Sequence, residues 1–295
     1  MPNTENEAEK KGAALKKLNV TFASGFFTGM FCSALFNPWD RALYLSVKNN
    51  IPFISWNNFT SPYQGFSQAI VQRAFLNSIY FVMQSEMKYY MDPYLRNNLG
   101  FTEASSQFCI GIGAGSVSGI FTNGISAVKY HMWGDINRSF YSSAQQMWSS
   151  GGFDPFFKGT LATMGRDMVF GSVYEVLRTL IRAELLKHNY GLKESHLDFF
   201  SNSTAAGIAT IASGPLNYVR NIQYATPPHM KSPTTRAVLK NVWDESKQHA
   251  SFSARMWFFQ QRFRVGWGTA RVAVGMAVSQ KVFDVTCTKL NGLSG

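Results

Sequence analysis

The sequence predicts an all-α membrane protein whose six tilted transmembrane helices form three repeats about a pseudo-threefold axis. Three observations indicate this: six apolar stretches of membrane-compatible length, a scarcity of charged residues, and small residues at matching places in alternate stretches. The stretches cover residues 19–47, 65–91, 103–133, 159–187, 196–225 and 258–285. No window is apolar without interruption over about 18 residues, so a soluble helical protein with a large core remains the alternative.

The composition favours helices that are apolar outside and polar inside. Charged residues make up 15% of the chain and apolar residues 45%, whereas soluble domains carry about 25% charged residues. The net charge of +11 predicts anionic partners such as phosphates, acidic metabolites or anionic lipid. Because the basic residues are scattered among apolar segments, we do not expect nucleic acid as a partner.

The cysteines and histidines predict neither a metal site nor an enzyme. Three cysteines stand far apart, which fits neither a disulfide framework nor a zinc site: Cys32, Cys109 and Cys287. Four histidines lie in links or at helix ends without a nucleophile or acid beside them: His131, His188, His229 and His249. We therefore expect no catalytic residue, no metal and no cofactor.

The chain divides into a polar tail and three repeats. Residues 1–18 mix acids and lysines without arginine, which predicts a disordered or interfacial tail and no cleaved targeting signal. The repeats are expected at 19–100, 101–190 and 191–295, within one integral domain.

The odd-numbered stretches align when Pro38, Gly124 and Pro215 are taken as equivalent, at spacings of 86 and 91 residues. Small residues then lie thirteen, nine and five positions upstream in each copy. They are Gly25, Gly29 and Ser33, then Gly111, Gly115 and Gly119, and more weakly Asn202, Ala206 and Thr210. Small residues every four positions let membrane helices approach closely, although tight packing in a soluble bundle gives the same pattern.

The even-numbered stretches also share a pattern. An aromatic residue stands two positions before Gly65 and Gly159, and Gln72 and Arg166 follow these glycines by seven residues. The sixth stretch lacks the glycine, and we expect Arg264 to be the equivalent of Gln72 and Arg166.

With these motifs the chain resembles the mitochondrial carrier family, as a divergent member. The family signature, Pro-x-Asp/Glu-x-x-Lys/Arg at the end of each odd helix, corresponds here to 38-PWDRAL-43, 124-GISAVK-129 and 215-PLNYVR-220. The stretch 143-SAQQMWSSGGFDPFFKG-159 resembles the family's short matrix-side helix and its aromatic-basic-glycine motif. The resemblance implies a monomeric, multi-pass protein of the mitochondrial inner membrane that transports a small molecule by alternating access. The asparagine-rich links also fit a carrier-like effector that an intracellular bacterium delivers to host mitochondria.

The resemblance implies a matrix-side gate in which each acid pairs with the base of the next repeat. The corresponding residues are Pro38, Asp40, Gly124, Ser126, Lys129, Pro215, Asn217 and Arg220. Only Asp40 with Lys129 keeps an acid and a base, Ser126 can offer Arg220 at most a neutral hydrogen bond, and Asn217 would face Leu43. We therefore predict a weak gate, which favours net transport over strict exchange.

Two further parts of the carrier plan are degraded. The cytoplasmic-side motif is matched by 174-YEVLR-178, while Glu86 with Lys88 is only a loose candidate. From Pro38 to Gly65 the first link is 27 positions long, against 35 in the second copy. This difference predicts a first matrix-side helix that is truncated or absent.

The resemblance places the substrate midway down a cavity, on the even helices. The corresponding residues are Gln72, Arg73, Arg166, Asp167 and Arg264, and Arg271 should share the face of Arg264. Several guanidinium groups predict an anionic substrate, and a nucleotide such as ATP or ADP is favoured. Phe75, Tyr80 and Trp267 are candidates to stack on its base.

Other substrates and roles remain open. Asp167 beside Arg166 resembles family members that carry amino acids, and a keto acid also fits the cationic site. The degraded signatures keep a non-transporting membrane adaptor in view as well. Gly65 and Gly159 are candidate cardiolipin sites, because helix N-termini expose free N–H groups to a lipid phosphate.

Overall fold

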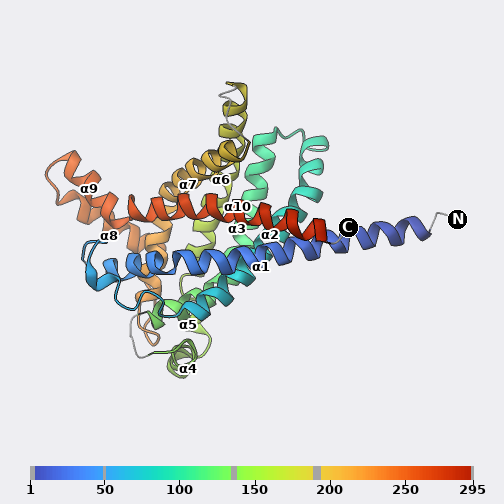
Figure 1. The fold of residues 1–295 in the computed structure, drawn as a ribbon. Helices are drawn as coiled ribbons and strands as arrows, with labels where there is room; N and C mark the ends of the chain where they lie inside the picture. Colours follow the sequence, from blue (N-terminus) through green and yellow to red (C-terminus); the bar gives the residue numbers. More distant parts are fainter. Residues whose placement is uncertain (1–3, 49–50, 134–137, 189–193, 294–295) are drawn as a thin grey trace.

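The protein is built from helices, as a computed structural model of residues 4–48, 51–133, 138–188 and 194–293 shows (Figure 1). The described residues form no strand, which confirms the all-α prediction. Six long helices account for most of the chain: α1 (Thr4–Lys48), α2 (Phe66–Asn97), α3 (Glu103–Met132), α6 (Thr160–Lys187), α7 (Glu194–Ala225) and α10 (Trp267–Leu293). Five short elements lie in the links: 3-10 helix η1 (Trp56–Asn58), α4 (Phe140–Gly151), α5 (Asp154–Phe157), α8 (Thr235–Lys247) and α9 (Phe252–Arg262).

The long helices pack in a closed ring. Each one contacts the next in the order α1, α2, α3, α6, α7 and α10, and α10 returns to α1. Within the described residues, Leu18–Ser46 of α1 is the one segment long and apolar enough to span a membrane by length and composition. The six long helices are therefore observed, whereas the six membrane spans expected from the sequence stay a prediction.

The small residues of the odd helices lie where helix backbones touch. A Cβ on Gly29 of α1 would collide with the backbone of Arg73 and Ala74 in α2. A Cβ on Gly111 of α3 would lie 2.6 Å from the carbonyl oxygen of Gly171 in α6, and the reverse distance is also 2.6 Å. The four-residue spacing thus marks helix contacts, as predicted.

The repeats share a structural detail at the end of the odd helices. Asn37 and Asn123 each directly precede the equivalent residues of the signature, and each donates from Nδ2 to a carbonyl in the following link, that of Pro62 or Phe156, at 2.8 Å. In the third repeat the matching residue is Gly214, which has no side chain to do this. Two of the three odd helices are therefore tied to the next helix start in the same way.

The starts of the even helices correct the expected place of Arg264. Gly65 and Gly159 cap α2 and α6 with left-handed backbones, at φ 70° and 74°, and Arg264 has the same conformation at φ 58°. Gly266, at φ 123°, directly precedes α10 as Gly65 and Gly159 precede α2 and α6. Arg264 therefore lies in the turn before α10 and not seven residues into a helix. The left-handed residue also breaks the sixth stretch, so α9 and α10 replace the single helix expected at 258–285.

Two predictions about the links and the tail have different outcomes. Between α1 and α2 the described residues 51–65 hold the three-residue η1 instead of a matrix-side helix, which confirms the predicted truncation. The tail, however, is not disordered, because α1 extends back to Thr4 and projects beyond the ring (Figure 1).

Candidate functional site

A cavity of about 500 Å³ lies inside the ring and is lined by all six long helices. All six residues predicted to bind substrate line it: Gln72, Arg73, Arg166, Asp167, Arg264 and Arg271. Five of the eight predicted gate residues line it as well: Asp40, Ser126, Lys129, Asn217 and Arg220. The structure thus brings the two predicted sets of side chains together around one cavity. Three predicted gate residues do not line it, namely Pro38, Gly124 and Pro215.

The cavity is strongly cationic. Six basic side chains line it, namely Arg73, Lys129, Arg166, Arg220, Arg264 and Arg271, against two carboxylates, Asp40 and Asp167. A concave site with walls of one sign concentrates counter-ions of the other sign. The excess of four positive charges favours anions in this cavity.

The sequence predicts Lys129 as the partner of Asp40, but in the structure two arginines bind Asp40 instead. Arg271 forms a fork on its carboxylate, from Nε to Oδ1 at 2.5 Å and from the terminal nitrogen to Oδ2 at 2.9 Å. Arg73 donates to the same Oδ2. The reason is the helix order: α1 packs between α2, which carries Arg73, and α10, which carries Arg271.

Lys129 points to an aromatic ring instead of an acid. Its Nζ lies 4.4 Å from the centre of the Trp133 ring, and it forms no ion pair with any described residue. This distance is typical of a cation–π contact, which is weaker than a buried ion pair. The ammonium group therefore remains available to an anion in the cavity.

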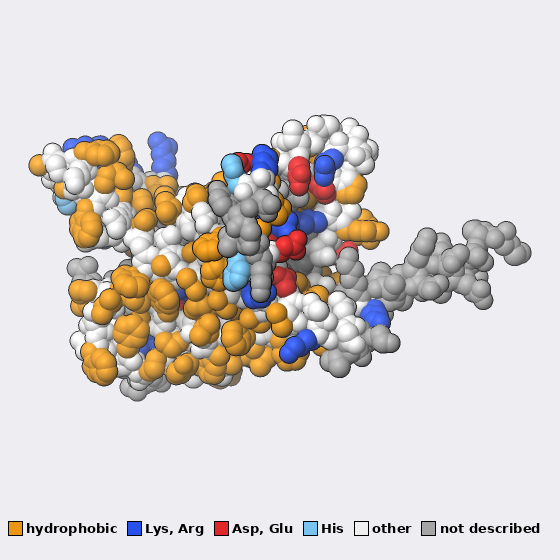
Figure 2. Space-filling model, turned by 45° about the horizontal axis from the view of Figure 1, so that its top comes forward, with side chains coloured by type: hydrophobic (Ala, Val, Ile, Leu, Met, Phe, Trp, Pro, Cys, Tyr) orange, Lys and Arg blue, Asp and Glu red, His pale blue; other side chains and the backbone are white. Residues whose placement is uncertain are grey.

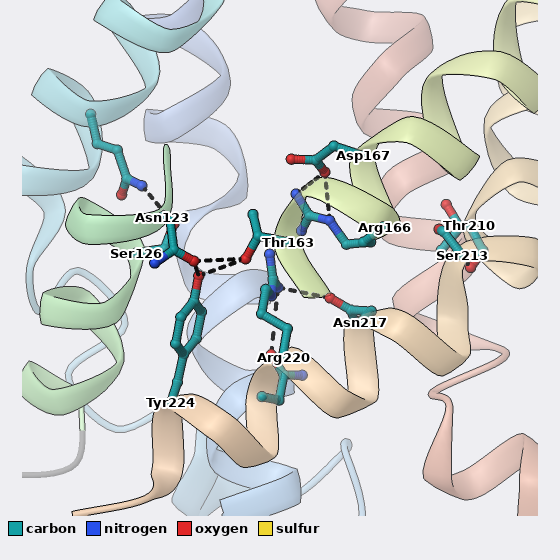
Figure 3. Close-up of polar contacts among 12 residues, drawn as sticks. Asn123, Ser126, Thr163, Arg166, Asp167, Thr210, Ser213, Asn217, Arg220 and Tyr224 are labelled. Atoms are coloured by element: carbon teal, nitrogen blue, oxygen red, sulfur yellow. Dashed lines mark hydrogen bonds and ion pairs between the residues drawn. The ribbon is translucent and has the colours of Figure 1, made fainter. Parts of the chain in front are cut away.

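Arg166 and Asp167 pair with each other from neighbouring positions on α6, with Arg166 Nε donating to Asp167 Oδ1 at 2.6 Å (Figure 3). The other oxygen of Asp167, Oδ2, is buried and accepts no hydrogen bond from a described residue. Thr210 and Ser213 line the same cavity from α7. A buried oxygen without a donor favours a ligand that brings one.

Arg220 also has a hydrogen-bond donor without an acceptor among the described residues. It donates to Asn217 Oδ1 at 2.7 Å (Figure 3), and its guanidinium lies over the rings of Tyr130 and Tyr224 at 5.9 and 5.6 Å. Its Nε is buried and finds no acceptor among the described residues. The predicted hydrogen bond from Ser126 does not form, since Ser126 instead accepts from Gln72 Nε2 at 3.3 Å.

Asn217 accepts a hydrogen bond from Arg220 on its own helix and also lines the cavity. Leu43 lines the cavity and places no charge there. The one acid–base pair expected in the gate, Asp40 with Lys129, is therefore not formed among the described residues.

Hydrogen bonds from tyrosine hydroxyl groups join α1, α3 and α7 at the end of the ring that carries the signature residues. Tyr44 donates to the carbonyl oxygen of Tyr130 at 3.0 Å, and the Tyr130 hydroxyl donates to Asn221 Oδ1 at 2.7 Å. These three residues follow Pro38, Gly124 and Pro215 by six positions, so they are equivalent in the repeats. The sequence analysis missed them, although the same spacing that located the signature would have found them.

A second missed network lies beside these hydrogen bonds. Tyr224 and Thr163 both donate to Asn123 Oδ1, at 2.8 and 2.9 Å (Figure 3). The three residues belong to α7, α6 and α3, so a buried polar cluster ties three helices of the ring together. A Cβ on Gly159 would lie 3.0 Å from the Tyr224 ring. Both this close contact and the positive φ of the residue favour glycine at this position.

The opposite end of the ring carries an ionic network. Glu175 of α6 is 1% exposed and accepts from Lys88 of α2 and from Arg178, both at 3.0 Å. Glu175 and Arg178 of the motif 174-YEVLR-178 thus form an ion pair within α6, and Lys88 joins Glu175 to α2. The loose pairing of Glu86 with Lys88 is not formed, because Lys88 bonds to Glu175.

The aromatic motif before α6 anchors a link. Lys158 donates to the carbonyl oxygens of Pro227, Pro228 and Met230 at 2.6, 3.1 and 2.7 Å. Burial lowers the pKa of Lys158 from its ordinary value, and Asp154 opposes this shift.

One of the three residues expected to stack on a base, Trp267, can be placed, and it does not line the cavity. Trp267 stacks on Phe53 at 5.1 Å and contacts Trp39, outside the cavity lining. The side chains of Phe75 and Tyr80 lie outside the described residues. The aromatic residues that line the cavity are Tyr44, Tyr130, Trp133, Phe170 and Phe263.

No family model matches the sequence, and no curated protein matches it.

Proposed function

We propose that this protein is a membrane transporter of the mitochondrial carrier type, which moves a small anionic metabolite by alternating access. The observation that carries the proposal is the ring of six helices around a cavity with six basic and two acidic side chains. Charged groups in membrane helices are costly unless they face a bundle interior or water, which is the arrangement here.

The distribution of polarity on α1 supports a membrane span for this helix over a place in a soluble core. Phe22, Phe27 and Phe31 are 41%, 53% and 49% exposed on its outer face, whereas Ser24 and Thr28 are fully buried. Figure 2 shows hydrophobic side chains spread over much of one outer face of the ring. A soluble protein has the reverse arrangement, because burying apolar area is what stabilises it. The mitochondrial inner membrane is proposed from the family resemblance.

A nucleotide suits the cavity best. Its volume of about 500 Å³ is in the usual range for small-molecule sites. The excess of four positive charges complements a di- or triphosphate, and arginine forks bind phosphate oxygens in pairs. Arg220 Nε, which is buried without an acceptor, offers a donor to such a group.

A zwitterionic amino acid is the second candidate. The buried Oδ2 of Asp167 has no donor among the described residues, and an ammonium group would supply one. Keto acids lack that donor and suit the site less well.

Transport requires that the cavity open at each end in turn. The hydroxyl chain of Tyr44 and Tyr130 holds one end, and the network of Glu175 with Lys88 holds the other. We propose that these two contacts break alternately during the cycle.

Uptake by purified protein in liposomes tests the proposal. Labelled ATP, a labelled amino acid and a labelled keto acid are each offered to empty vesicles and to vesicles loaded with unlabelled compound. We expect uptake of ATP, with a loss of at least tenfold in Arg220→Gln. The matched control is Arg236→Gln, which removes the same charge from an exposed position on α8 outside the cavity.

No uptake of any compound would reject transport and favour an adaptor role. Extraction of the protein from membranes by carbonate would reject the six spans themselves.

A further inference from the structure

Arg73 and Arg271 form an anion site that a side chain of the protein already fills. The two guanidinium groups converge on one carboxylate, with Arg271 forked on both oxygens of Asp40 and Arg73 on Oδ2. A phosphate or carboxylate ligand is bound by arginine in this same forked way. Asp40 therefore makes the contacts that a bound anion would make.

Arg271 is positioned by residues other than Asp40. The carbon at the centre of its guanidinium lies 4.5 Å from the centre of the Phe36 ring. Its side chain runs along α10 over Gly275, where a Cβ would lie 3.4 Å from that carbon and would collide with a terminal nitrogen. Arg271 thus has contacts with Phe36 and space over Gly275 that do not depend on Asp40.

Asp40 can be replaced from the cavity. All three side chains line it and remain partly exposed, Arg73 by 24%, Asp40 by 18% and Arg271 by 11%. Asp40 is the second residue after Pro38, which removes a backbone hydrogen bond from α1 and leaves that helix easier to bend there. An incoming anion therefore reaches the arginines without crossing protein.

We propose that Asp40 is a built-in competitor of the substrate, which must displace its carboxylate from Arg73 and Arg271 in order to bind. The proposal rests on the proposed transport function for its biological meaning, while the competition itself is a property of binding. It also specifies the ligand, which must present a phosphate or carboxylate group that replaces the forked contact. Substrate binding then frees the charged residue of the α1 signature.

Calorimetric titration of inorganic pyrophosphate into the purified full-length chain in detergent tests the competition. If Asp40 fills the site in nine-tenths of the molecules, it weakens binding about tenfold. Asp40→Asn should therefore bind pyrophosphate about tenfold more tightly than the unsubstituted protein. Asp40→Ser, which also cannot bridge the arginines, is measured in parallel in case Asp40→Asn does not fold.

Two double variants separate competition from a general gain of positive charge. In a protein that carries Arg271→Gln, adding Asp40→Asn should no longer tighten pyrophosphate binding. In a protein that carries Arg264→Gln, adding Asp40→Asn should still tighten it. Arg264 lines the same cavity but makes no contact with Asp40. An equal gain in both backgrounds would overturn the proposal, as would unchanged, weaker or undetectable binding in the single variants.

Liposome uptake distinguishes this proposal from the transport function. Tighter binding without uptake of any compound rejects transport and leaves the competition standing. Uptake of ATP with unchanged pyrophosphate affinity in Asp40→Asn rejects the competition alone.

Discussion

Replacing Gly111 by alanine should push α3 and α6 apart, and the cost follows from the geometry. The new Cβ would lie 2.6 Å from the carbonyl oxygen of Gly171 and 2.7 Å from the Cα of Ser172. An ordinary carbon–oxygen contact is about 3.4 Å or longer, so the backbones must separate by about 0.8 Å. Overpacking of this kind costs about 1–3 kcal/mol, partly offset by the gain of about 1 kcal/mol that alanine brings to a helix interior.

Gly124→Ala on the same helix is the matched control. Its Cβ would meet one described atom, the carbonyl oxygen of Phe156, at 3.9 Å. Both variants gain the same helix propensity, so the difference between them isolates the overlap at Gly111.

Thermal unfolding of the two purified proteins in detergent measures that difference. With about 2–4 °C for each kcal/mol in domains of this size, Gly111→Ala should melt about 2–12 °C below Gly124→Ala. Gly171→Ala should behave like Gly111→Ala, because the contact is reciprocal at 2.6 Å. Equal melting temperatures for Gly111→Ala and Gly124→Ala would show that α3 and α6 do not meet through these glycines.

Three further predictions concern the gate, the helix start and the link. Tyr130→Phe removes the donor to Asn221 and should destabilise the protein by about 0.5–1.5 kcal/mol in thermal unfolding, with Tyr141→Phe, an exposed tyrosine, as the neutral control. Arg264→Gly should raise the unfolding free energy by about 1 kcal/mol, because glycine adopts φ 58° without strain. The same variant should bind ATP more weakly, and unchanged ATP binding would show that Arg264 is not part of the site. Lys158→Met loses three carbonyl contacts and should speed tryptic cleavage at Lys231; an unchanged rate would show that Lys158 does not hold the link.

The lining of the cavity could be predicted because it depends on spacing alone. Gln72 and Arg166 follow the glycine that starts each helix by seven residues, so both turn to the same side of the ring. Arg264 was misplaced for a physical reason. Glycine is the usual residue for a left-handed backbone, and nothing in the sequence marks an arginine that adopts this conformation.

The partners of Asp40 could not be predicted from the signature. The signature pairs an acid of one repeat with a base of the next, so it assumes that α1 meets α3 near Asp40. In the structure, α1 packs between α2 and α10, and Asp40 bonds to arginines of these two helices. The tyrosines were missed for a different reason. Tyr44 and Tyr130 lie in apolar stretches, where an aromatic residue is more often an outer or core side chain than a donor in a chain of hydrogen bonds.

The serine at position 126 weakens the predicted gate and also makes the cavity more cationic. Ser126 stands where the signature has the acid that would pair with Arg220, and Asp40, the signature partner of Lys129, is bound by Arg73 and Arg271 instead. Arg220 and Lys129 therefore keep their charges without an ion pair to a described carboxylate. With the ring of ion pairs gone, Asp40 is left to the cavity arginines, and closure at that end depends on neutral hydroxyl groups. These contacts cost about 1 kcal/mol each to break. In the proposed transport cycle this end would therefore open without separating buried charges, and we expect the anion that competes with Asp40 to supply the energy that governs access.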